Sequence, residues 1–193
     1  MQFVCISNVN ASAVLDANIA ALYAQMGETD AAAEWLQGSL ARMTGKDRKY
    51  FLPQLQLELA SLRARQDRME EALELFRKGI DGAERSGNQA LSATGWNRLG
   101  EELLRKHELA RAEHALLEAY QIRKLHRMVR LEVSYWDLGM LRLEQGDLEA
   151  AGALLDRAVE MTAGPRGPLP EWQLFSARGR VRLAQAPARR LSS

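Results

Sequence analysis

A single pattern recurs along almost the whole chain at a spacing of about forty residues. Four turn positions mark it, Gly27, Asp67, His107 and Gly146, which lie 40, 40 and 39 residues apart. A fifth half-unit follows, because Gly179 lies 40 residues after Gly139. Self-similarity at such a period is the signature of a repeat array, in which each unit packs on its neighbours.

Between the turn positions, apolar residues have the spacing of amphipathic helices. Val14, Ala17, Ala21 and Ala24 are separated by three or four residues, which places them on one helical face. No strand pattern is present, so the sequence predicts an all-α protein. The expected helices are residues 12–26, 31–42, 52–65, 69–86, 91–106, 109–127, 131–145, 148–162 and 171–185, with a turn at 44–47 and a Pro/Gly-rich loop at 163–170.

We expect one repeat domain over residues 1–186. Its repeats would be about 12–45, 52–88, 91–128 and 131–163, with a half-repeat at 171–186. Residues 187–193 would form a mobile tail, since Pro187 cannot continue a helix. The half-repeat would be a capping helix, because Arg178 and Arg182 occupy positions that would otherwise meet a further helix.

Small residues recur where neighbouring helices must approach closely. With the turn residue numbered 15 in each repeat, position 8 is Ala20, Ala60, Gly100, Gly139 and Gly179. Position 20 is Ala32, Ala72, Ala112 and Ala151, and position 27 is Ser39, Gly79, Ala119 and Ala158. Large apolar residues fill around these contacts, as at position 24, which is Leu36, Phe76, Leu116 and Leu155.

Charge and composition exclude several classes of protein. Lys plus Arg total 26 and Asp plus Glu total 25, a balance that argues against a general nucleic-acid or membrane-surface binder. Cys5 is the only cysteine, so no internal disulfide can form. The N-terminal residues lack the pattern of a signal peptide, and no run of 18 apolar residues is present. A cytoplasmic protein is expected.

The repeat resembles the tetratricopeptide repeat (TPR). The signature is Trp96-x-x-Leu99-Gly100-x-x-Leu103, followed by Ala112 and Ala119. The resemblance implies an all-α, TPR-like α-α superhelix (solenoid) of about four helix pairs plus a C-terminal capping helix. A standard TPR has about 34 residues, so each unit here carries about six more, or ~9 Å of additional helix.

A second resemblance is to the repeat region that precedes the caspase-like CHAT protease domain of some bacterial proteins. Residues 93–104, 122–127 and 154–159 carry it. It implies a regulatory or sensor role in a protease system. No CHAT catalytic segment is present in the chain, so the resemblance carries over no catalysis.

Catalytic and metal-binding patterns are lacking. Cys5 lies outside the repeats, and His107, His114 and His126 are at a turn, within a helix and at a helix end. There is no HExxH, CxxC or phosphate-binding glycine loop. We therefore expect no enzymatic activity, no cofactor and no metal.

The strongest charge cluster is the basic run Arg123, Lys124, His126, Arg127 and Arg130. It is interpreted as the solvated end of a long helix, with a patch for an acidic partner or nucleic acid as the alternative. Nucleic acid is disfavoured because no aromatic residues are interleaved for base stacking.

The resemblance to TPR proteins implies that the first helix of each pair lines a groove. The groove positions would be Val14, Ala17, Ala21, Ala24 and Gln25 in repeat one, and Gln54, Leu57, Ser61, Ala64 and Arg65 in repeat two. The expected binding residues are Asn97, Glu101, Arg105, Trp136, Met140, Glu144 and Arg180, because they combine an aromatic anchor with polar and charged groups. The alternative for Trp136 is packing between adjacent helices. A chaperone-tail clamp is disfavoured, because Ala17 and Ala21 stand where it needs Lys and Asn.

The sequence therefore predicts a non-catalytic scaffold that binds a protein or peptide client in its groove. The alternatives are the regulatory part of a CHAT-type protease system and a sensor module of a transcription regulator. The latter would need a DNA-binding domain that this chain lacks.

Overall fold

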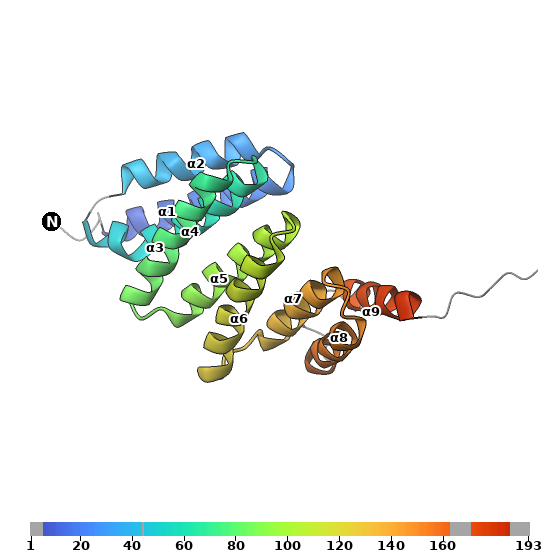
Figure 1. The fold of residues 1–193 in the computed structure, drawn as a ribbon. Helices are drawn as coiled ribbons and strands as arrows, with labels where there is room; N and C mark the ends of the chain where they lie inside the picture. Colours follow the sequence, from blue (N-terminus) through green and yellow to red (C-terminus); the bar gives the residue numbers. More distant parts are fainter. Residues whose placement is uncertain (1–5, 44, 163–170, 186–193) are drawn as a thin grey trace, which may run out of the picture. The chain divides into compact units, whose positions relative to one another are not determined.

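The computed structural model describes residues 6–43, 45–162 and 171–185 (Figure 1). Within those ranges it contains nine α-helices and no β-strand, as predicted. The helices are α1 (Ile6–Gln25), α2 (Thr29–Arg42), α3 (Gly45–Arg65), α4 (Met69–Arg85), α5 (Gln89–Arg105), α6 (Leu109–Leu125), α7 (Leu131–Glu144), α8 (Leu148–Thr162) and α9 (Glu171–Gln185). The predicted loop at 163–170 and the predicted tail at 187–193 lie outside the described residues.

Two helices begin earlier than the sequence pattern predicts. Helix α1 begins at Ile6, six residues before the predicted start at 12, and α3 begins at Gly45 instead of 52. The predicted turn at 44–47 is therefore wrong for its last three residues. Pro53 lies inside α3, where it lacks an N–H for the helical bond. It is buried beneath α4, where its ring and its carbonyl lie against Gly82 and Gly79.

The chain divides into two compact units, Met1–Glu102 and Leu103–Ser193, with the boundary inside α5. In the first unit α2 packs on α1 and α3, and α4 packs on α3. Its core has two clusters. One is built around Leu36, Leu55 and Leu62, and the other around Leu57 and Phe76.

In the second unit α7 packs on α6 and α8, and α9 packs on α8 and touches α7. Ala177 and Val181 of α9 are buried against Ala151 and Leu155 of α8. The Arg178 guanidinium, expected on the outer face of α9, lies 2.6 Å from the Asp156 carboxylate of α8. The outer face of α9 also exposes two apolar side chains, Phe175 and Leu183, which are 57% and 79% exposed.

The four predicted turn residues share one backbone conformation. Gly27, Asp67, His107 and Gly146 all have positive φ, at 85°, 60°, 56° and 81°. The residue after each turn residue donates its N–H to a carbonyl five residues earlier, as Arg68 does to Arg63 (2.9 Å) and Glu108 to Leu103 (3.0 Å). This is the Schellman arrangement that ends a helix at a left-handed residue. The forty-residue period seen in the sequence is therefore the distance along the chain between successive left-handed residues that end the first helix of each repeat.

We expect His107→Gly to raise the free energy of unfolding by about 0.5–1 kcal/mol. A non-glycine residue is strained at positive φ, and part of that gain is offset by the greater freedom of glycine in the unfolded chain. His107 is largely exposed and approaches Glu144 only at 4.0 Å, so little contact is lost. Urea unfolding followed by circular dichroism measures the change. Gly146→Ala, at the equivalent turn (φ 81°), should destabilise the protein. Destabilisation by His107→Gly would contradict the prediction.

The small residues of the repeat are buried at the helix contacts, as predicted, with the exception of Gly179. Position 20 is 0% exposed in all four repeats (Ala32, Ala72, Ala112 and Ala151). At position 8, a Cβ on Gly139 would lie 2.9 Å from Leu155 Cγ of α8, whereas a Cβ on Gly179 of α9 would meet nothing within 4 Å. The close contact of α7 with α8 thus has no counterpart at Gly179. No helix in the described part of the chain is long and apolar enough to span a membrane.

Candidate functional site

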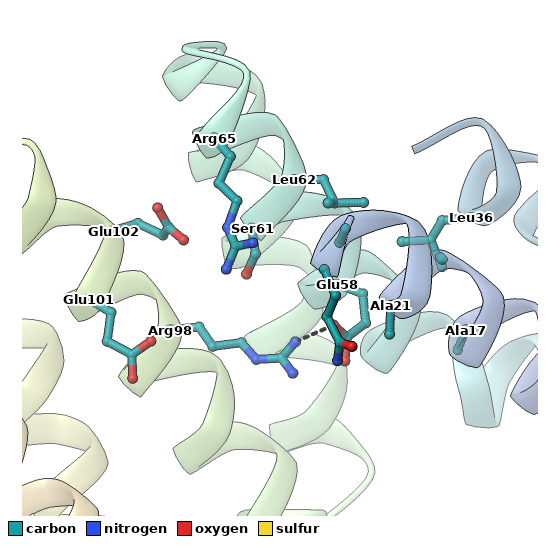
Figure 2. Close-up of a pocket in the computed structure, with 13 residues that line it drawn as sticks. Ala17, Ala21, Leu36, Glu58, Ser61, Leu62, Arg65, Arg98, Glu101 and Glu102 are labelled. Carbon is teal, nitrogen blue, oxygen red and sulfur yellow. Dashed lines mark ion pairs between the residues drawn. The ribbon is translucent and has the colours of Figure 1, made fainter. Parts of the chain in front are cut away.

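A groove opens in the first unit on the side lined by α1, α3 and α5 (Figure 2). It has a volume of about 230 Å³ and lies between the first helices of three successive repeats. We call it the α1–α3–α5 groove. Its lining residues are Ala17, Ala20, Ala21, Ala24, Gln25, Leu36, Glu58, Ser61, Leu62, Arg65, Arg98, Glu101 and Glu102.

One wall of the groove is made of alanine side chains. Ala17, Ala21 and Ala24 are spaced by four and three residues, so they form one stripe along α1, next to the buried Ala20. Leu62 of α3 continues the apolar surface. Because alanine projects only a methyl group, this stripe leaves room in front of α1 while remaining apolar. The wall can therefore take up an apolar side chain of a partner.

The opposite side of the groove is charged. The Arg98 guanidinium of α5 lies 2.8 Å from the Glu58 carboxylate of α3, and both side chains are about one-third exposed. Asn97 donates a hydrogen bond of 2.6 Å to Glu101, one turn later on α5. These contacts hold two of the three lining carboxylates, Glu58 and Glu101, in place. The third, Glu102, is buried.

Arg65, the last residue of α3, differs from Arg98 in its surroundings. It is exposed, and its guanidinium extends toward Ser61 on the groove side of α3 (Figure 2). Among the described residues, no ion pair involves Arg65, whereas Arg98 is paired with Glu58. The groove thus presents one cation available to a partner beside an apolar wall.

The seven binding residues predicted from sequence are divided between the two units. Asn97 and Glu101 belong to the first unit, where Glu101 lines the groove and Asn97 is buried, with 4% exposure. Arg105, exposed at the end of α5, belongs to the second unit with Trp136, Met140, Glu144 and Arg180.

Within the second unit the predicted residues form two local groups. Trp136 and Met140 are half-buried against the Ala151, Leu155, Ala177 and Val181 cluster, so the indole contributes to packing between helices. Glu144 lies 3.6 Å from Arg180 and 4.0 Å from His107. A binding patch made of all seven residues stays a prediction.

Several groove residues do not follow from the register used on the sequence. That register also places Leu57 and Ala64 in the groove, but they are buried in the core, with 0% and 1% exposure. The other register positions that line the groove in the first two repeats are Ala17, Ala21, Ala24, Gln25, Ser61 and Arg65. Glu58 and Arg98, which the register omits, line the groove instead. They are 40 residues apart and so occupy the same position in successive repeats. Opposite charges at one repeat position were the available signal.

The basic run at the end of α6 is not wholly solvated. Arg123 is buried, with 6% exposure, and donates a hydrogen bond of 2.7 Å to the Ser134 hydroxyl of α7. Lys124 lies over the Tyr120 ring at 5.4 Å from its centroid. The interpretation as a solvated helix end is therefore wrong for Arg123, while Lys124, His126 and Arg127 are exposed. Among the described residues, no group of three His, Cys, Asp or Glu side chains is placed to hold a metal ion.

Comparisons with known proteins agree with the helical-repeat arrangement. Residues 133–164 match the tetratricopeptide repeat family model. The solved structure of BtubC (BKLC) from P. vanneervenii is similar with a TM-score of 0.77 and 23% identity, over 92% of this chain and 74% of that chain. A putative kinesin light chain from Podosopora anserina with nearly identical TPR-like repeats is similar with a TM-score of 0.63 and 18% identity, over 94% of this chain and 98% of that chain. No curated protein matches the chain.

These similarities confirm the predicted fold class, an all-α, TPR-like helical repeat. TPR-like repeats are generally scaffolds for interactions between proteins. The resemblance to the repeats of CHAT proteins is not tested by these comparisons and stays a prediction.

Proposed function

We propose that the chain is a non-catalytic scaffold that binds a peptide segment of a protein client in the α1–α3–α5 groove. The observation that carries this proposal is the Arg65 guanidinium, which has no ion pair among the described residues and lines the same groove as the alanine wall of α1. A partner segment gains a charge-assisted hydrogen bond and apolar burial at the same place. Among the described residues, no ion pair of Arg65 would have to be broken for a partner to bind, and the alanine wall is open to the groove.

The groove also indicates the chemistry of the segment. The Arg65 guanidinium is suited to bind a carboxylate of the client, and a charge-assisted hydrogen bond of this kind contributes about 1.5–3 kcal/mol to binding. The alanine stripe and Leu62 call for a bulky apolar side chain next to that carboxylate, worth about 1.5–3 kcal/mol when fully buried. The Glu58–Arg98 pair at the rim disfavours segments that place a lone charge against it. The favoured client segment is acidic and apolar.

Peptide display against the whole chain tests this function. We expect enrichment of sequences with an acidic residue close to a large apolar residue. Arg65→Gln should weaken the enriched peptides at least about tenfold in fluorescence anisotropy, since about 1.4 kcal/mol is a factor of ten. Arg85→Gln is the matched control, because Arg85 is likewise an exposed final residue of a helix, α4, with no ion pair among the described residues.

Three outcomes would contradict the proposal. One is a display that enriches no sequence class, and another is equal weakening by Arg65→Gln and Arg85→Gln, which would indicate general electrostatic attraction. In the third, Trp136→Ala abolishes binding while Arg65→Gln has no effect. That result would assign the client to the predicted residues of the second unit instead.

A further inference from the structure

A second pocket lies between α3 and α4 in the first unit, and it shares no lining residue with the α1–α3–α5 groove. Its volume is about 390 Å³. We call it the α3–α4 pocket. Its lining residues are Leu52, Pro53, Gln56, Lys78, Gly82, Arg85 and Ser86.

At this pocket, repeat two has a glycine where the other repeats have long side chains. Gly82 occupies the repeat position held elsewhere by Arg42, Ile122 and Met161. A Cβ at Gly82 would lie 2.8 Å from Pro53 Cγ, so α4 approaches the proline ring of α3 closely at this point. The missing side chain therefore lets the two helices pack together here, and the pocket lies beside this contact, lined by Gly82, Pro53 and Leu52.

The charged residues that line this pocket are both cations. Lys78 and Arg85 lie four and three residues from Gly82 on α4, so all three share one helical face. Among the residues whose side chains the structure describes, no carboxylate lines the pocket. Both cationic side chains are exposed and long enough to converge over Gly82.

Neither cation is firmly committed to another contact. Among the described residues, no ion pair involves Arg85. Lys78 lies 3.1 Å from Glu74, but Arg77 contacts the same carboxylate at 2.9 Å. Hydrogen bonds from Arg77 and Lys78 lower the pKa of Glu74 to about 2, so Glu74 is charged at neutral pH. If Lys78 turns toward an anion in the pocket, Glu74 keeps Arg77 as its partner.

We propose that the α3–α4 pocket binds a phosphate monoester that carries an apolar group. Such a phosphate has a charge of about −1.5 to −2 at pH 7, which matches the two lining cations better than a single carboxylate does. Arg85 offers the planar donor group suited to phosphate oxygens, and Gln56 adds an amide donor at the same pocket. The apolar group would lie on Leu52 and Pro53. This site is independent of the peptide groove.

Titration of the whole chain with phenyl phosphate, followed by amide chemical shifts, tests the proposal. We expect saturable shifts centred on Gly82, Arg85 and Ser86. Benzyl alcohol, which has the ring without the charge, and inorganic phosphate, which has the charge without the ring, should each bind at least about tenfold more weakly.

Substitutions then separate specific binding from general attraction. Arg85→Gln should weaken phenyl phosphate about tenfold, whereas Arg182→Gln, a matched loss of an exposed charge in the last turn of α9, should change the affinity less than about twofold. Lys78→Gln should also weaken binding. Shifts that are absent, unsaturable or centred elsewhere, or equal losses in Arg85→Gln and Arg182→Gln, would overturn the proposal.

The source of the phosphate is distinguished by a second ligand. A short phosphoserine peptide with a neighbouring leucine is compared with its unphosphorylated form and with phenyl phosphate. Tighter binding of the phosphopeptide than of phenyl phosphate would indicate a phosphorylated protein segment, and the reverse order would indicate a free organic phosphate. Equal binding of both peptide forms, without dependence on Arg85, would count against the site. The peptide groove depends on Arg65 and the α3–α4 pocket on Arg85. If peptide display found no client for the groove, the phosphate-binding result for the α3–α4 pocket would therefore be unaffected.

Discussion

Gly79→Val is expected to lower the free energy of unfolding by about 3 kcal/mol. Gly79 is buried on α4 at the small position where α4 crosses α3. A Cβ there would lie 2.7 Å from Leu57 Cγ and 2.9 Å from the Pro53 carbonyl oxygen. The leucine is itself fully buried, and the carbonyl belongs to the backbone, so neither can move aside without shifting α3. Overpacking of this kind typically costs about 1–3 kcal/mol, and the branched valine is at the upper end.

Two alanine substitutions at a shared repeat position serve as controls. Gly139→Ala should destabilise the protein, because its methyl group would lie 2.9 Å from Leu155 Cγ and Leu155 is fully buried. Gly179→Ala should stabilise α9 by about 0.5–1 kcal/mol, because nothing lies within 4 Å and alanine is the better helix former. Urea unfolding by circular dichroism measures all three. Destabilisation by Gly179→Ala, or a neutral Gly79→Val, would contradict this account of the small positions.

The repeat architecture could be predicted because the same physical requirement recurs in each unit. In each repeat, a residue in the left-handed conformation ends the first helix, and small residues lie where helices cross. Both requirements therefore recur in the sequence with the period of the repeat. The positive φ angles at Asp67 and His107 show that this trace survives even where the residue is not glycine. The start of α3 was missed because residues 44–47 have the composition of a turn, whereas the helix begins at Gly45.

The groove was harder to predict than the fold. The repeat register placed Ala17, Ala21 and Ala24 of α1 at groove positions, but the choice of binding residues favoured aromatic and charged anchors such as Trp136. A hollow, however, forms where side chains are short, and Ala17, Ala21 and Ala24 form its wall. Gly82 is the opposite case, because its missing side chain lets α4 pack closely on Pro53 of α3. A small residue can lie at a packed helix crossing or face open space. The neighbouring helix decides between the two, and the sequence of a single repeat does not contain that information.

Phe76→Ala is expected to cost about 4 kcal/mol of unfolding free energy, within the 3–5 kcal/mol typical of phenylalanine truncation in a core. Phe76 is 0% exposed at position 24 of repeat two, and it packs in a cluster with Leu57 and Ile80, against which Trp96 and Leu99 of α5 also rest. Because this one side chain joins α4 to the helices on both sides, its removal leaves a cavity at the contact between neighbouring repeats. The stability of a repeat array depends on such contacts as much as on each repeat.

The matched control is Phe175→Ala, which truncates the same kind of side chain where it is 57% exposed on α9 and should cost less than about 1 kcal/mol. Phe76→Leu keeps the site apolar and should retain enough stability to be measured if Phe76→Ala does not fold. Its cost should lie between those of the two alanine variants, because a smaller cavity remains. Thermal and urea unfolding of the four proteins provide the comparison. Similar losses for Phe76→Ala and Phe175→Ala would mean that position 24 does not form the contact between repeats, and would remove the physical basis assigned here to the forty-residue period.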